Sequence, residues 1–256
     1  MIRNIFGKIA AGTLLLAAMS LLLPLTASAQ DADVSYNQVR TVHVKTSKVG
    51  EFIELQKQFK AALEAAGRPG RGVWQEIRGD QNVFHLVVRA DNLASLDTPF
   101  ERPMEDDVWD EYVGALSDTI SSNTRVITRR YPGLSIPAGE DVAPSMLVVR
   151  STLVAPGKGA AFRDWQRDHL VPALKAGGAT GRGFSKVVFG GNTDRHISTS
   201  LIDNWAALDG PGPIGEMSAE DRNAMFAALG EGTVWESDVR IMRFRGDLSH
   251  RSPPEE

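Results

Sequence analysis

One helical segment of the sequence combines a histidine with aromatic residues at a spacing that could build a site. Trp165 and His169 lie four residues apart, and Phe162 precedes His169 by seven. On a helix this spacing places the three side chains on one face, so we expect His169 to be buried against a sheet. A buried imidazole without a partner stays neutral and can accept a proton or bind a metal or haem iron. His169 is the candidate catalytic residue, and a hydrogen-bonded core histidine is the structural alternative.

Two further histidines, His85 and His196, occupy corresponding places early in two alternating strands. His85 shares one strand face with Arg89, because side chains two residues apart point the same way. His196 likewise shares a face with Ser198 and Ser200. The opposite faces are more apolar, so we expect the histidine-bearing faces to line a partly polar space between two sheets. The alternative is that each histidine caps a turn or hydrogen-bonds across a strand seam.

Two arginine pairs recur at matched positions of the chain: Arg40 with Arg150, and Arg71 with Arg182. A matched arginine can anchor an anionic ligand, whereas a structural ion pair or stacked side chain kept from a duplication is the alternative. The predicted ligand-binding residues are Trp165, His85, His196, Arg89 and Arg150.

Composition narrows the classes of protein. The 256 residues include no cysteine, which excludes disulfides, a thiolate-bound metal and a cysteine nucleophile. The net charge of -4, without a long Lys/Arg cluster, disfavours nucleic acid as a partner. P-loop, zinc-protease, EF-hand and Ser-hydrolase motifs are missing from the sequence. We predict no metal site, no membrane association after export, and a small apolar or aromatic molecule as the partner.

The first 29 residues resemble an export signal. Arg3 and Lys8 form a basic start, residues 9–25 are apolar, and Ala27-Ser28-Ala29 is an A-x-A cleavage site. A retained anchor is the alternative, but polar residues and a proline interrupt a run that is short of the ~20 residues of a membrane helix. We therefore expect a periplasmic or secreted protein that begins at Gln30.

The mature chain is one unit used twice. Matching segments follow in the same order, with an offset that grows from 110 (Val39 to Val149) to 114 (Leu134 to Leu248). In each half, strand and helix patterns alternate as β-α-β-β-α-β, the ferredoxin-like order. The sequence therefore predicts an α+β fold in which two ferredoxin-like units pack sheet to sheet as an intramolecular barrel. The expected bounds are 1–29 for the signal peptide, 38–136 for repeat 1, 137–144 for a linker, 145–249 for repeat 2 and 250–256 for a disordered tail.

This tandem arrangement resembles the dimeric α/β-barrel superfamily. Residues 162–172 are similar to the F-x-x-W-x-x-x-H-x-P segment of EthD-like and antibiotic-biosynthesis-monooxygenase-like proteins, with one extra residue between His169 and Pro172. Repeat 1 has Leu55 and Phe59 at the Trp165 and His169 positions.

Together with the export signal, the resemblance implies an exported small-molecule-binding protein, with a cofactor-independent monooxygenase-like or cyclase-like enzyme as its catalytic form. A non-catalytic binding or scaffold protein is the first alternative. A haem-binding barrel with His169 as axial ligand is the second, and otherwise no cofactor is predicted. Because this fold serves many functions, it does not decide among them.

Overall fold

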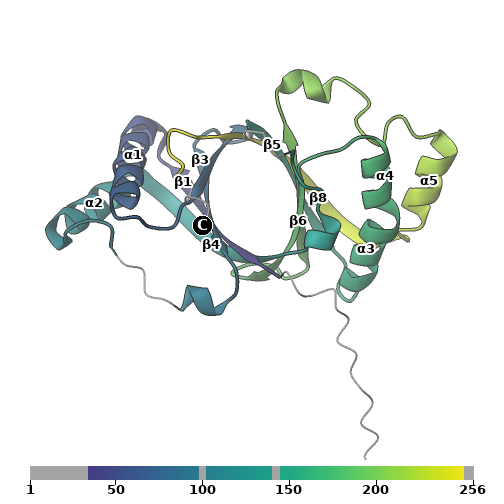
Figure 1. The fold of residues 1–256 in the computed structure, drawn as a ribbon, viewed down its shortest axis with the longest axis horizontal. Helices are drawn as coiled ribbons and strands as arrows, with labels where there is room; N and C mark the ends of the chain where they lie inside the picture. The colour runs from purple at the N-terminus through teal and green to yellow at the C-terminus, as the bar shows by residue number, and fades with distance from the viewer. Residues whose placement is uncertain (1–33, 98–101, 140–144, 251–256) are drawn as a thin grey trace, which may run out of the picture. The chain divides into compact units, whose positions relative to one another are not determined.

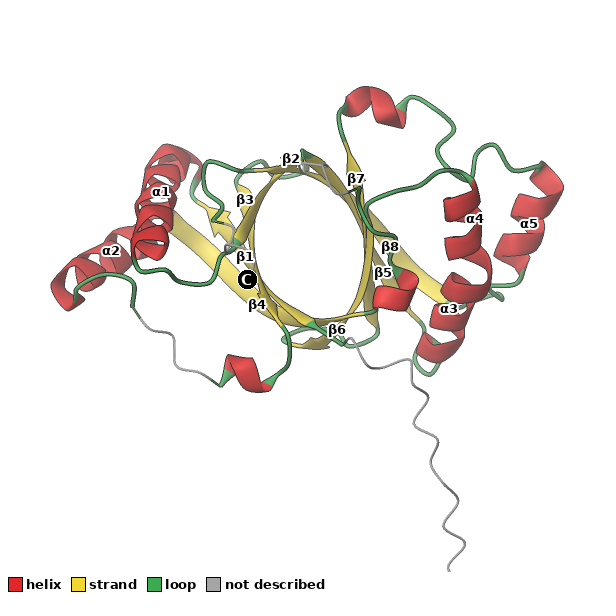
Figure 2. Cartoon of the chain, viewed as in Figure 1, coloured by secondary structure: helices red, strands yellow, loops and turns green. Residues whose placement is uncertain are grey.

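Eight antiparallel strands close into a barrel, and the helices lie outside it on two opposite sides (Figures 1 and 2). The computed structural model describes residues 34–97, 102–139 and 145–250, which all belong to the unit Ala32–Glu256. The predicted signal peptide, most of the predicted linker and all but His250 of the predicted tail lie outside the described residues. Within the described chain, no helix is both long and apolar enough to cross a membrane.

Each half of the barrel has the predicted order of elements. Repeat 1 consists of β1 (Tyr36–Val44), α1 (Val49–Ala65), β2 (Gly72–Arg78), β3 (Val83–Ala90), α2 (Asp106–Thr119) and β4 (Ile120–Arg130). Repeat 2 consists of β5 (Met146–Val154), α3 (Gly159–Trp165), a π-helical turn (Gln166–Leu170), α4 (Val171–Ala176), β6 (Arg182–Phe189), β7 (Arg195–Ile202), α5 (Ala219–Ala227) and β8 (Val234–Phe244). The predicted α+β class and ferredoxin-like units are thus confirmed.

The two sheets are joined at both edges. The strand order is β4-β1-β3-β2 in repeat 1 and β8-β5-β7-β6 in repeat 2, and β2 pairs with β8 while β4 pairs with β6. Every strand therefore has two hydrogen-bonded neighbours, so the barrel has no open edge. The sheets face each other as predicted. The two seams, where β2 pairs with β8 and β4 pairs with β6, close the barrel, and side-chain patterns do not predict this pairing.

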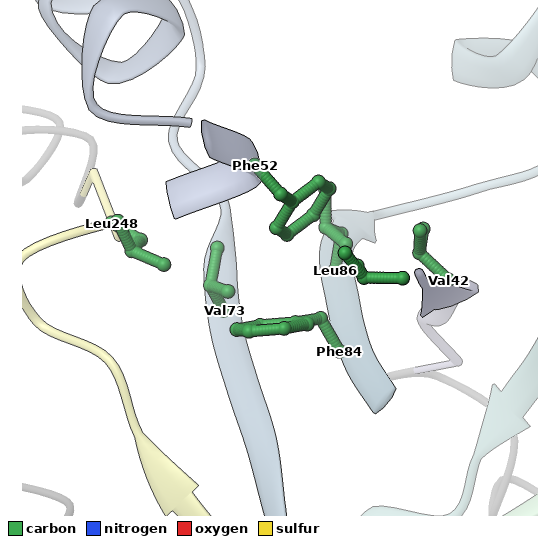
Figure 3. Packing of buried hydrophobic residues seen from close by; sticks show 7 residues of the cluster. Val42, Phe52, Val73, Phe84, Leu86 and Leu248 are labelled. Carbon is green, nitrogen blue, oxygen red and sulfur yellow. The ribbon is translucent and has the colours of Figure 1, made fainter. Parts of the chain in front are cut away.

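Helix α1 shows why its segment folds onto the sheet. Its buried positions, Phe52, Leu55, Gln56, Phe59 and Leu63, follow the 3.6-residue period and form one stripe. The helix ends where Gly67 adopts a φ of 59°, a left-handed conformation that a glycine takes without strain. Phe52 packs on Phe84 of β3 with ring centroids 4.8 Å apart (Figure 3). Burial of such a ring stabilises the fold by about 2–3 kcal/mol.

The segments that follow β4 and β8 cross to the opposite repeat. Leu248, which is fully buried, packs in the repeat 1 core beside Val73 (Figure 3), and Val73 N donates to Ser249 Oγ at 2.8 Å. Leu134 packs in the repeat 2 core in the same way, and Phe184 N donates to Ser135 Oγ at 3.1 Å. Each repeat thus completes the core of the other with the residues after its last strand. His250 continues the second crossing by pairing with Arg71.

Candidate functional site

His169 does not take the buried place that its spacing predicts. Its side chain is exposed, and it lines a pocket of about 300 Å³ together with two carboxylates, Asp168 and Asp221. The cause is the π-helical turn Gln166–Leu170, whose i→i+5 bonding places one more residue in the turn than an α-helix does. The expectation of a buried His169 is therefore wrong.

The extra residue also changes which positions of the two repeats correspond. Phe52 and Gln56 match Phe162 and Gln166 at an offset of 110, but Arg71 matches Arg182 at 111. The counterpart of Phe59 is therefore Leu170, which packs against the repeat 2 core, and not His169.

His196 faces the helices and not the barrel interior. Thr152 pairs with His196 as Val42 pairs with Phe84, so the counterpart of His196 is Phe84 rather than His85. Its imidazole is 1% exposed and lies between Phe162 and Phe184, with ring centroids 5.1 and 5.8 Å away. The prediction that His196 shares a lumen with His85 is wrong, because a one-residue shift moves every side chain of a strand to the other face.

Burial governs the protonation of His196. Desolvation, together with the nearby positive charge of Arg163, lowers the pKa of the imidazole to about 4, against the opposing effect of a hydrogen bond to the Asp194 carbonyl. The Nδ1 atom lies 3.2 Å from that carbonyl oxygen, while the buried Nε2 atom has no hydrogen-bond partner in the described part of the chain. His196 is therefore a neutral core side chain at neutral pH.

His85 lies on the face of β3 that points away from α1, as predicted. Its Nε2 lies 2.9 Å from Glu76 Oε1 and its Nδ1 lies 3.0 Å from Thr41 Oγ1. Because a carboxylate only accepts, Nε2 is the donor to Glu76. Arg240 Nη1 donates to the same carboxylate oxygen at 3.0 Å from β8, across the seam between the repeats. His85 thus belongs to a structural network, and its predicted ligand-binding role stays a prediction.

The carboxylate at the centre of this network is held ionised. Burial alone raises the pKa of Glu76, but the hydrogen bonds and charges of His85 and Arg240 outweigh it and lower the pKa below its ordinary value. Glu76 is 4% exposed, so an unpaired charge here would be costly. The network therefore fastens β2 to β8.

The other predicted ligand-binding residues lie apart from one another. Trp165 is buried in the repeat 2 core, where its Nε1 donates to the Met225 carbonyl at 2.7 Å. Arg89 is exposed at the end of β3, with Asp91 at 3.5 Å. Arg150 is exposed on β5 and donates to Ser237 Oγ at 3.3 Å. The structure does not bring these residues together into one site.

A larger cavity lies in repeat 1, between α1, α2 and the sheet. Its volume is about 650 Å³. Phe59, Trp109 and Tyr112 form an aromatic wall in which the Phe59 and Tyr112 rings stack with centroids 5.6 Å apart. The full lining consists of Gln38, Arg40, Gln56, Phe59, Leu63, Arg68, Pro69, Arg71, Leu86, Val88, Ser95, Trp109, Tyr112, Leu116 and Arg125. The candidate binding site is therefore in repeat 1, whereas the candidate catalytic residue His169 lies in repeat 2.

Polar groups in the cavity wall form a short buried chain. Arg71 Nη2 donates to Gln56 Oε1 at 2.8 Å, and Gln56 Nε2 lies 3.5 Å from the Tyr112 hydroxyl. Burial is the main cause that lowers the pKa of Arg71 to about 10; Tyr112 opposes it and nearby Arg40 adds to it, and the guanidinium is charged at neutral pH. Burial raises the pKa of Tyr112, which keeps its hydroxyl protonated and able to donate.

The matched residues of repeat 2 make the same first contact and then a different one. Arg182 Nη2 donates to Gln166 Oε1 at 2.6 Å, as Arg71 does to Gln56. Arg182 also donates through Nη1 to the carbonyl of Leu134, on the segment that crosses from repeat 1. The sequence shows the duplicated Gln and Arg pairs. It does not show that a cavity lies beside the pair in repeat 1.

The residues present do not fit a haem held by His169. That histidine is exposed beside two carboxylates, and the larger cavity has no histidine among its described lining residues. His169 and the larger cavity therefore lie in different repeats. Among the residues that the structure describes, no cluster of three or more His, Asp or Glu side chains could hold a metal ion.

Comparison with known proteins identifies the fold. No protein-family model matches the chain, and no curated protein matches it significantly. A putative monooxygenase from Lactobacillus acidophilus NCFM has a TM-score of 0.56 and 10% identity, over 86% of this chain and 97% of that one. A putative monooxygenase from Fusobacterium nucleatum subsp. nucleatum has a TM-score of 0.56 and 7% identity, over 86% and 99%.

An anthrone oxidase-like protein is similar to the same degree, with a TM-score of 0.56 and 13% identity over 87% of this chain and 95% of that one. At identities this low the likeness concerns the fold alone. The chain has the dimeric α/β-barrel fold, formed here within one polypeptide, and this prediction is confirmed.

Proposed function

We propose that this protein binds a small, largely aromatic molecule in the helix–sheet cavity of repeat 1. The observation that carries the proposal is a cavity of about 650 Å³ whose surface is mostly apolar and aromatic, with four arginines, two glutamines and one serine among its lining residues. Small-molecule sites have this character and occupy about 300–1,000 Å³. The N-terminal sequence supports export as the second part of the proposal, so the ligand would be met outside the cytoplasm.

The cavity walls offer a planar ligand two kinds of contact. The rings of Phe59 and Tyr112 on one side and Leu86 and Val88 on the other supply apolar surface. The Tyr112 hydroxyl, kept protonated by burial, supplies a hydrogen bond that orients the ligand. Aromatic pairs of this kind contribute about 0.5–1.5 kcal/mol beyond the area that they bury.

The catalytic form of the proposal uses the same cavity. A cofactor-independent monooxygenase-like or cyclase-like reaction needs its substrate held away from water, and binding is the step that comes first. The first alternative has two forms: a non-catalytic binding protein also binds a small molecule saturably, whereas a pure scaffold expects no saturable binding. The binding measurement therefore separates the pure scaffold from the other readings.

The test is a titration with a neutral, environment-sensitive naphthalene dye, followed by fluorescence. Val88 lines the cavity, and Val88→Trp should fill it and abolish saturable binding. Ser200 lies two residues after Ser198, as Val88 follows Leu86, on the matching strand of repeat 2. Ser200→Trp is therefore the matched control and should bind as the parent does. No saturable binding by the parent, or equal loss in both variants, would refute the proposal.

A further inference from the structure

We propose that the natural ligand of the repeat 1 cavity is an aromatic carboxylate whose negative group is held by Arg40 and Arg71. This inference rests on the proposed function and adds the chemical class of the ligand. It is carried by the charges of the cavity wall, by donors left without acceptors, and by the contrast with repeat 2.

The charged side chains among the described lining residues of the cavity are all arginines. Arg40, Arg71 and Arg125 are the three that concern the ligand, and no aspartate or glutamate is among the described lining residues. Arg40 and Arg125 are directly paired in register on β1 and β4, so two like charges share one wall. Burial lowers the pKa of Arg40, and the charge of Arg125 lowers it further. A bound anion would relieve this repulsion.

Buried donors in the wall lack acceptors. Arg71 is 8% exposed, and its buried Nε atom has no hydrogen-bond partner among the residues that the structure describes. The buried Nε atom of Arg40 has none either, and Arg40 forms no salt bridge within residues 34–97, 102–139 and 145–250. A guanidinium has five N–H donors in a planar fork that fits a carboxylate, and a buried donor left unsatisfied is costly. A carboxylate is the group that would satisfy both residues.

Repeat 2 shows how the protein satisfies the same arginines when no ligand is involved. Arg182, the counterpart of Arg71, donates to Gln166 and to the main-chain carbonyl of Leu134. Arg150, the counterpart of Arg40, is exposed and bonded to Ser237. The Phe59 ring lies 4.4 Å from the Arg71 guanidinium. Aromatic surface therefore adjoins the positive charge, and we infer that the ligand carries its carboxylate on an aromatic group.

The experiment compares two probes of nearly equal shape, 2-naphthoate and its neutral amide, 2-naphthamide, as competitors of the bound dye at pH 7. Naphthoate should compete at least about 10-fold more strongly, as expected when a charged group gains hydrogen bonds. In Arg40→Met this preference should fall to about 3-fold or less. Arg78→Met removes the same charge from an exposed β2 position outside the cavity lining and should keep the preference.

The outcomes distinguish this inference from the function on which it rests. If the dye binds and is blocked by Val88→Trp, but naphthoate and naphthamide compete equally, the cavity binds ligands and the inference of an anion is overturned. The same conclusion follows if Arg40→Met and Arg78→Met reduce the preference alike, since only general charge would then matter. If the dye does not bind at all, both proposals are overturned together. Because naphthoate and naphthamide are compared on the parent protein, this part of the test does not depend on whether any variant folds.

Discussion

Replacing His196 by phenylalanine should reduce the loss of stability that the protein shows at mildly acidic pH. The imidazole is almost completely buried between Phe162 and Phe184, and its pKa is lowered to about 4 by desolvation. The corresponding position of repeat 1 holds Phe84, so the fold already accommodates a phenyl ring at this place in the sheet. The substitution therefore removes a titrating group with little change of packing.

The magnitude follows from proton linkage. The unfolded imidazole titrates near its ordinary pKa of 6.5 and the folded one near 4, so between these values the unfolded chain binds more protons. The free energy of unfolding therefore falls as the pH falls through this window. The loss attributable to His196 is about 2 kcal/mol between pH 7 and pH 5, and about 3 kcal/mol once the pH is below both values.

Urea unfolding at pH 7, 6 and 5, followed by tryptophan fluorescence, measures this effect. His196→Phe should lose about 2 kcal/mol less than the parent between pH 7 and pH 5, because all other groups titrate in both proteins. His169→Phe is the control, since its exposed side chain is not desolvated and the parent pH dependence should persist. Equal losses in the parent and in His196→Phe would show that the imidazole is not buried as described.

Three further predictions concern other parts of the chain. Gln56→Leu should lower the free energy of unfolding by about 1–3 kcal/mol, because buried Arg71 loses its acceptor. Gln166→Leu should lower it less, because Arg182 keeps a main-chain acceptor, and equal losses in urea unfolding would contradict this. Glu76→Gln should destabilise the protein at pH 7, and the difference in unfolding free energy from the parent should shrink as the pH falls below about 4, because the carboxylate stabilises the fold only while it is ionised. A difference that stays constant with pH would contradict the proposed network. Mass spectrometry of exported protein should find a chain that starts at Gln30, and an intact Met1 would reject the cleavage site.

The fold could be predicted from the sequence because the patterns of strands and helices are local and occur in both repeats. Strand and helix patterns alternate in the ferredoxin-like order, and the duplication presents that order twice. The faces of β3 were also assigned correctly, since Phe84 and Leu86 pack under α1. The barrel seams could not be foreseen in this way, because pairing of β2 with β8 and of β4 with β6 depends on long-range register that alternation does not encode.

The expected placements of His169 and His196 were wrong because two single-residue insertions were overlooked. One lies in the π-helical turn and moves His169 to the surface. The other precedes β7, where the offset between repeats becomes 112, as the match of Asp91 with Asp203 already indicates. One residue more in a hairpin exchanges the two faces of the strand that follows, which is why His196 meets the helices. The repeat 1 cavity depends on how α1 and α2 pack, and no local pattern in the sequence predicts that.

The crossing of Leu134 and Leu248 into opposite cores has a consequence for how the molecule comes apart. Neither half can lose its structure without exposing a buried leucine and two strand edges of the other, so we expect one cooperative unfolding transition and not two. A chain cut between the repeats should persist only as a complex of its two fragments. For the same reason, loss of the short segment after β8 would damage the half of the protein that is most distant from it in sequence.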